Sequence, residues 1–138
     1  MIEAFFCLFY SQDEASEEFI GEWTEKRGIR DQLIIATKVH IAPYLNLFRS
    51  SHTNNLRSLQ YTGNYKRGQD NITHQVNYTG NHAKSLYIST HESLRKLRTS
   101  YIDILYVHWW DYNTSVEEVM NSLHILVLQG KVLYLVSL

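Results

Sequence analysis

The sequence predicts an α/β fold assembled from βαβ units. Short apolar runs bounded by turn residues alternate with amphipathic helical patterns, and helical patterns open on capping residues and close at glycine. The 138 residues, 44% of them apolar and 20% charged, have the size and composition of one globular domain. Together these features predict a parallel sheet of four strands with three crossover helices.

The first unit begins with the apolar run 4–9. Ser16 is the expected N-cap of the next helix, because acidic residues follow it, and Gly28 is the expected C′ residue, because basic residues precede it. The run 33–38 is apolar until its last two residues, which is typical of a strand buried on both faces. In the helix expected between Ser16 and Gly28, the apolar stripe consists of Phe19, Ile20 and Trp23.

Helical periodicity returns at residues 85–99, where Ser89 and Glu92 offer a capping box. A strand is expected over 102–108. The residues that recur at helical spacing, and therefore share one face of this helix, are Leu86, Thr90, Leu94, Leu97 and Tyr101.

The last helix is expected after a second capping box, Ser115 with Glu118, and it closes at Gly130 before a final strand over 132–136. One side of this helix is apolar, with Val116, Val119, Met120, Leu123, Leu126 and Val127.

Residues 39–76 break the pattern. They are rich in Asn, Ser, Thr and Gly, they lack sustained periodicity, and they contain the chain's one proline, Pro43. Loops longer than about 12 to 15 residues are uncommon in compact domains. We therefore expect an inserted or poorly ordered loop here.

Charge and cysteine content exclude several classes of function. Thirteen basic against 14 acidic residues leave no electrostatic footprint for nucleic acid. The single cysteine, Cys7, cannot form an internal disulfide. Neither a signal peptide nor an apolar stretch long enough for a membrane span is apparent. We therefore expect a cytoplasmic protein without membrane contact. The histidines lack metal-ligand spacing, so no metal site is expected.

Chemistry is expected at one edge of the sheet, because the carboxyl ends of parallel strands meet there. Lys38 and His108 end the second and third runs, and Tyr10 and Ser137 directly follow the first and fourth. A cation lowers the pKa of a nearby phenol, and an imidazole can donate to a carbonyl oxygen. Each residue also has an ordinary structural role open to it, since lysines snorkel at strand ends and lone histidines are commonly structural.

Several ordered motifs resemble the aldo-keto reductases, and more narrowly the fungal aryl-alcohol dehydrogenase and norsolorinic acid reductase group. The resemblance covers nearly the whole chain outside 39–76. The motifs are SEEFIGEW at 16–23, RDQLIIATK at 30–38, SLRKL at 93–97, YIDILYVHWW at 101–110 and GKVLYL at 130–135.

The resemblance implies an NADP-dependent (β/α)₈ TIM barrel that interconverts aryl aldehydes or ketones and alcohols through an Asp, Tyr, Lys and His tetrad. It makes Tyr10 the acid, Lys38 the neighbour that lowers the pKa of Tyr10, and His108 the group that orients a small carbonyl or alcohol substrate. Ser137 matches a serine that contacts the nicotinamide amide. Phe5 stands where the family has its Asp, and the glycine expected between Leu135 and Val136 is absent.

A complete barrel needs about 250 residues, so the resemblance implies a single partial domain over 1–138, with about strands two to five of a barrel. Such a domain has open strand edges. We expect impaired catalysis; the alternative is a non-catalytic α/β interaction module, a relic that self-associates through these edges.

Overall fold

The computed structural model describes residues 5–7, 15–39, 77, 80–107 and 112–137. It forms a layer of helices on a parallel sheet. In chain order the elements are β1 (Phe5–Cys7), α1 (Ala15–Arg27), the 3₁₀ turn η1 (Arg30–Gln32), β2 (Ile34–Val39), α2 (Ala83–Lys96), β3 (Ile102–Val107), α3 (Val116–Leu128) and β4 (Val132–Ser137).

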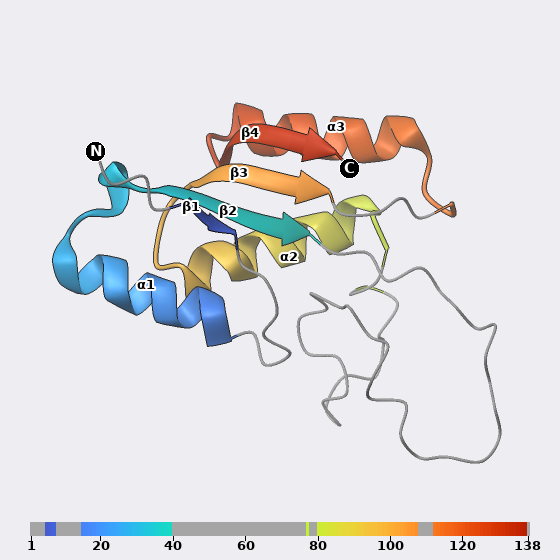
Figure 1. Ribbon diagram of the computed structural model, residues 1–138. Coiled ribbons are helices and arrows are strands. Elements are labelled where there is room, and N and C mark those ends of the chain that lie inside the picture. Colours follow the sequence, from blue (N-terminus) through green and yellow to red (C-terminus); the bar gives the residue numbers. More distant parts are fainter. Residues whose placement is uncertain (1–4, 8–14, 40–76, 78–79, 108–111, 138) are drawn as a thin grey trace, which may run out of the picture.

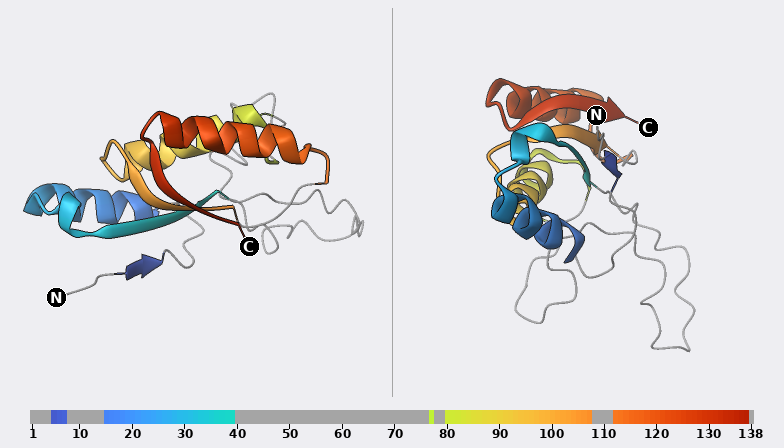
Figure 2. Two further views of the ribbon diagram at one scale, coloured as in Figure 1. Left: turned by 90° about the horizontal axis from the view of Figure 1, so that it is seen from above. Right: turned by 60° about the vertical axis from the view of Figure 1, so that its left-hand side comes forward.

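The sheet has the order β1-β2-β3-β4, and every neighbouring pair is parallel. The three helices lie on one side of it (Figures 1 and 2). This arrangement confirms the predicted α/β fold, with four strands and three crossover helices in the part of the chain that the structure describes. Val39, expected at the start of the loop, is instead the last residue of β2, and residues 40–76 lie outside the described residues.

Helix α1 begins and ends close to its predicted bounds. Glu17 and Glu18 lie in its first turn, where carboxylates favour the helix dipole, and Gly28 follows it with φ 61°, a conformation that glycine adopts without strain. The predicted apolar stripe is wrong in one place. Phe19 is 70% exposed, because the side that packs on the sheet is centred on the buried Ile20.

Helix α2 starts earlier than its capping box predicted. Its N-cap is His82, whose Nδ1 accepts a hydrogen bond from the backbone N–H of Ser85 at 3.3 Å. Ser89 and Glu92, the expected box, lie inside the helix. The prediction failed because an imidazole nitrogen serves as the cap acceptor here in place of a hydroxyl.

Helix α3 confirms its predicted cap. The Oγ of Ser115 accepts from the backbone N–H of Glu118 at 3.2 Å. Of the predicted apolar side, Val119, Leu123 and Leu126 are buried. Val116 and Met120 are 60% and 55% exposed, because they lie on the flank of the helix and not on the face that contacts the sheet.

Two clusters of buried side chains form the core between the helices and the sheet. One joins α1, α2, β2 and β3 through Ile20, Leu33, Ile35, Leu94, Leu97 and Ile102. The other joins α2, α3, β3 and β4 through Leu86, Leu105, Val107, Val119, Leu123, Leu126 and Val132. Helix α2 contributes to both clusters, so it lies at the centre of the packed layer.

A polar network ties η1 to the start of β3 at the amino edge of the sheet. The guanidinium of Arg30 lies 2.8 Å from Oδ2 of Asp103 and donates to the carbonyl of Tyr101 at 2.8 Å. The same guanidinium stacks on the Tyr101 ring, and the Tyr101 hydroxyl donates to Asp31 at 2.8 Å. Each group in the network therefore has a partner from another segment.

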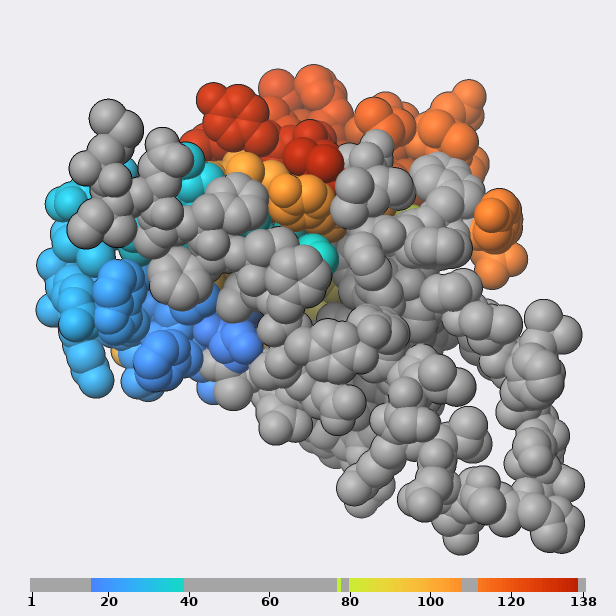
Figure 3. Space-filling model, viewed as in Figure 1, coloured from blue at the N-terminus to red at the C-terminus, as the bar shows by residue number. Residues whose placement is uncertain are grey.

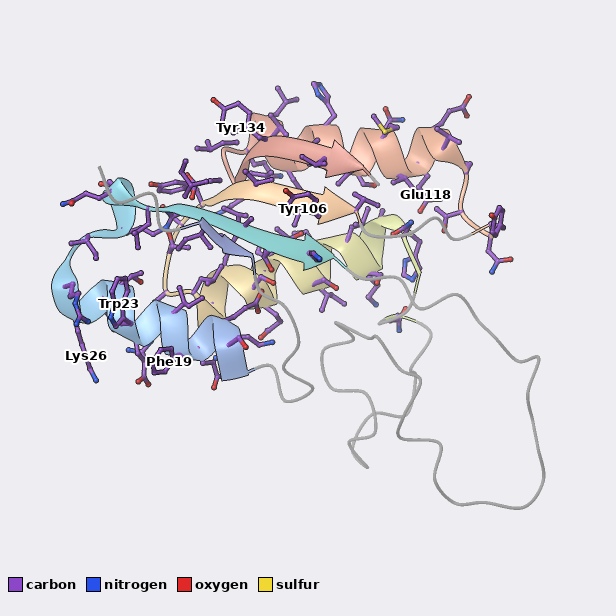
Figure 4. The ribbon with its side chains drawn as sticks, in the orientation of Figure 1. Phe19, Trp23, Lys26, Tyr106, Glu118 and Tyr134 are labelled. Atoms are coloured by element: carbon purple, nitrogen blue, oxygen red, sulfur yellow. The ribbon has the colours of Figure 1, made fainter. Side chains whose placement is uncertain are left out.

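Helices α1 and α2 approach each other closely at Gly21. A Cβ added there would overlap the carbonyl oxygen of Lys96 and lie 2.8 Å from the carbonyl carbon of Leu97. Backbone atoms cannot move aside as a side chain can. We therefore expect Gly21→Ala to lower the free energy of unfolding by about 2 kcal/mol in urea titrations. The exposed Lys26, in the same helix (Figure 4), supplies the control: Lys26→Ala should change stability by less than about 0.5 kcal/mol.

The Tyr101 phenol makes the free energy of unfolding depend on pH in the alkaline range. Burial, and then the hydrogen bond to Asp31, raise the pKa of Tyr101 above its ordinary value of 10.0. The stabilisation is therefore fully present below the pKa of the unfolded chain and is lost as pH rises through the higher pKa of the folded chain. We expect the stability difference between the wild-type chain and Tyr101→Phe to shrink from pH 8 to pH 11; an unchanged difference would contradict this.

Candidate active site at the carboxyl edge of the sheet

The carboxyl edge brings three strand ends together. Lys38 is the second-last residue of β2, and the last residue of that strand, Val39, pairs with Val107, the last residue of β3. On the other side Val107 pairs with Ser137, the last residue of β4. The strand ends expected to form a site therefore lie level with one another at one edge.

Lys38 belongs to the face of the sheet that carries none of the described helices. Its neighbour Thr37 donates a hydrogen bond to Glu17 of α1, and Ile35 packs among apolar residues of α1 and α2. Successive residues of a strand alternate between the two faces. Lys38 is accordingly on the opposite side from the helices, and it is half-buried there.

A buried carboxylate behind the strand fixes this end of β2. Oε1 of Glu17 accepts from the Thr37 hydroxyl at 2.6 Å, and Oε2 lies 3.8 Å from Nζ of Lys96. Both charged side chains are largely buried, 15% and 6% exposed. A short hydrogen bond and an ion pair thus hold the residue next to Lys38 against α1 and α2.

The other predicted site residues are less fully described. Tyr10 and His108 lie outside the described residues, although β3 ends at Val107, immediately before His108. Ser137 is placed by its backbone at the end of β4. The parallel, adjacent strands that the site requires are confirmed, and the roles of these residues stay predictions.

The register of β1 separates position 5 from Lys38. Phe5 pairs with Ile34, which precedes Lys38 by four residues on β2. At about 3.3 Å per residue, the two positions are about 13 Å apart along the strands. A carboxylate at position 5 would therefore be too far away to contact the Lys38 ammonium.

Sequence reasoning missed Tyr106. It pairs directly with Lys38 across β2 and β3, and it is half-buried. Leu105 and Val107 belong to the core under α2 and α3, so Tyr106 shares the face of Lys38. The signal was present in the alternation of β3, where the residue two places before His108 lies on the same face.

Neither a metal site nor a membrane span is found where the structure describes the chain. No group of three or more His, Cys, Asp or Glu side chains there could hold a metal ion. No helix in those same segments has both the length and the apolar character needed to cross a bilayer.

A family model identifies the chain. The model of the aldo/keto reductase family matches residues 6–136, nearly the full sequence. The chain belongs to this family. The resemblance noted in the motifs is thereby confirmed.

Several curated relatives of this aldo/keto reductase chain are aryl-alcohol dehydrogenases by name. One from Phanerodontia chrysosporium, whose name specifies NADP(+), is 54% identical over 126 residues, which cover 90% of this chain and 27% of that protein. A putative aryl-alcohol dehydrogenase of Saccharomyces cerevisiae is 51% identical over 124 residues, covering 90% and 28%. Norsolorinic acid reductase B of Dothistroma septosporum is 44% identical over 120 residues, covering 87% and 25%. The chain spans about a quarter of the length of these three relatives.

Removing the Glu17 carboxylate tests the support behind Lys38. Glu17→Ala removes the carboxylate that pairs with Lys96 and accepts from Thr37, so the free energy of unfolding in urea should fall by about 3 kcal/mol. Glu17→Gln should cost less, because its amide oxygen still accepts from Thr37. Glu25, also in α1 but 58% exposed beside Arg98, is the matched control. Its replacement by Ala should lower stability by at most about 1 kcal/mol, and equal losses at the two positions would contradict the assignment.

Proposed function

We propose that this aldo/keto reductase chain carries residues of an NADP-linked site that interconverts aryl aldehydes or ketones and their alcohols. The single observation that supports the proposal most is the pairing of Val39 with Val107 and of Val107 with Ser137. It aligns the ends of β2, β3 and β4, where the family motifs put their functional residues. The names of the relatives supply the aryl alcohol and the NADP(+).

The proposed chemistry is shared among three residues. The Tyr10 phenol gives its proton to the carbonyl oxygen during reduction, and Lys38 stabilises the phenolate that results. His108, directly after β3, orients the carbonyl oxygen by hydrogen bonding. In the oxidation direction the phenolate takes the proton back from the alcohol.

NADPH, when bound, supplies the hydride. Ser137 is assigned to contact the nicotinamide amide, and the end of β4, level with the ends of β2 and β3 near Lys38, supports this assignment. Arg30 and Arg98 are engaged in ion pairs with Asp103 and with carboxylates of α1, which leaves them unsuited to the cofactor's phosphates. The contribution proposed for the chain is therefore the Ser137 contact at the nicotinamide end of the cofactor.

The sheet also supports an assignment within the family fold. We infer that β1, β2, β3 and β4 correspond to about the second to fifth strands of a (β/α)₈ barrel, with α1, α2 and α3 outside. The helix-free face of the sheet then faces the barrel interior. This correspondence explains why Lys38 belongs to that face and Thr37 to the other.

A chimera tests the site within a full-length protein. We would replace the matching quarter of the Phanerodontia chrysosporium relative with residues 6–136 and follow NADPH oxidation with benzaldehyde. Lys38→Met and Tyr10→Phe should each lower kcat about 10²- to 10⁴-fold, because proton transfer is impaired. Lys84→Met, an exposed change in α2, is the control and should leave turnover unchanged. A chimera that is active and insensitive to both site changes would overturn the proposal.

The 138-residue chain itself should reduce benzaldehyde weakly or not at all. Phe5→Asp should not restore measurable reduction, because position 5 lies opposite Ile34 and about 13 Å from Lys38 along the strands. Robust turnover by the unmodified chain, lost on Tyr10→Phe, would contradict the expected impairment. Self-association through strand edges stays a prediction; concentration-dependent assembly without NADPH binding would favour the interaction module instead.

A further inference from the structure

Three polar side chains meet in the interior behind the carboxyl end of β2. The Thr37 hydroxyl donates to Oε1 of Glu17 at 2.6 Å, and Nζ of Lys96 lies 3.8 Å from Oε2 of the same carboxylate. Thr37 is 4% exposed, and Lys96 is the only buried charged residue in the segments that the structure describes. We call Thr37, Glu17 and Lys96 the rear cluster, because they lie on the side of β2 opposite Lys38.

Stability alone does not explain why polar groups are buried in the rear cluster. Helix α1 reaches the molecular surface on its outer side (Figure 3), whereas Glu17, on its inner side, is only 15% exposed. The attraction between a buried carboxylate and a buried ammonium offsets only part of their lost hydration, and apolar side chains in such places are often at least as stabilising. What the charged groups add is direction, because a hydrogen bond to a carboxylate fixes both of its partners.

The residue that the rear cluster fixes is the neighbour of Lys38 in β2. Successive residues of a strand belong to opposite faces, so Thr37 and Lys38 share one peptide group but face different sides of the sheet. A planar peptide group transmits a rotation of one residue to the next. The orientation of Lys38 therefore depends on the orientation of Thr37.

A small rotation of β2 is sufficient to matter for a reacting group. In an extended lysine the side-chain nitrogen is about 6 Å from Cα, so rotating the strand by about 10° displaces this nitrogen by about 1 Å. A displacement of that size can lower a reaction rate about 10²-fold. Partial loss of the restraint on Thr37 should therefore be measurable as a fall in kcat.

We propose that Thr37 and Glu17 are positioning residues of the reductase site, which act through the backbone of β2 to hold the direction of the Lys38 ammonium. The inference rests on the proposed function, because it requires Lys38 to stabilise the Tyr10 phenolate. Neither positioning residue touches the substrate. Lys96 pairs with the second oxygen of Glu17 and so keeps the first oxygen directed at Thr37.

Three substitutions separate positioning from packing. Thr37→Val removes the hydroxyl and nearly preserves the shape of the side chain, whereas Thr37→Ser keeps the hydroxyl. Thr24→Val is the matched control, because Thr24 is 2% exposed and its hydroxyl donates to the carbonyl of Gly21 at 3.0 Å. Thr24 lies about two turns, or about 10 Å, along α1 from Glu17. The control therefore removes a buried hydroxyl from the same helix at a distance from Lys38.

The chimera that carries residues 6–136 gives the kinetic measurement. Thr37→Val should lower kcat about tenfold and leave KM nearly unchanged, because Lys38 acts on proton transfer and not on substrate affinity. Thr37→Ser and Thr24→Val should each retain most of the kcat. In a chimera that already carries Lys38→Met, Thr37→Val should cause no further loss, whereas a general structural defect would lower kcat in both backgrounds alike.

The full 138-residue chain gives a measurement that needs neither NADPH nor turnover. By NMR, the backbone amide shifts of Lys38 and Val39 should change in Thr37→Val, return toward the wild-type values in Thr37→Ser, and stay unchanged in Thr24→Val. If Thr37→Val does not fold, Glu17→Gln carries the test. Its neutral amide is a weaker acceptor than a carboxylate, so the same amide signals should move by a smaller amount.

Equal losses of kcat in Thr37→Val and Thr24→Val, or a Thr37→Val loss that persists in full beside Lys38→Met, would overturn the positioning role and leave the proposed function in place. Unchanged amide shifts of Lys38 and Val39 in Thr37→Val, or in Glu17→Gln where that variant carries the test, would also overturn it. An active chimera that is insensitive to Lys38→Met would contradict the proposed function, and the amide shifts would then decide the restraint on β2 separately.

Discussion

The packing of β2 against α1 and α2 depends on the largely buried carboxylate of Glu17. One of its oxygens accepts from Thr37, and the other lies near the ammonium of Lys96, so three elements meet at a single side chain. In a medium of low dielectric, the pairing of these two charges offsets part of their loss of hydration. Because Lys38 is the next residue of the strand, the contact that stabilises the core also fixes the backbone that carries the candidate site's cation.

The order of the elements could be predicted because each depends on local chemistry. Gly28 and Gly130 both adopt positive φ after helices, and Ser115 caps α3 as its spacing with Glu118 indicated. Exposure was harder to predict. A stripe of apolar residues is wider than the contact it makes, so Phe19 and Met120 remain in solvent although both fit the periodic pattern.

Only part of the candidate site could be predicted. Lys38 ends an apolar run, and the rule that parallel strands share an edge was sufficient to place it. Tyr106 was overlooked because an apolar run appears uniform until its neighbours are assigned to the core. The register of Phe5 was not predictable either, since a three-residue strand offers too few polar or charged side chains to distinguish one pairing from the next.

The long separation between paired segments has a consequence for the order of folding. Ile102 of β3 pairs with Val132, 30 residues later, through the single crossover of α3. The contact from Arg30 to Tyr101 instead joins residues 71 apart. Closing the longer loop costs only about 0.8 kcal/mol more in chain entropy, but segments this far apart in the sequence meet less often, so their contact forms more slowly. The β3-α3-β4 unit is therefore expected to form before the contacts that join it to η1 and β2.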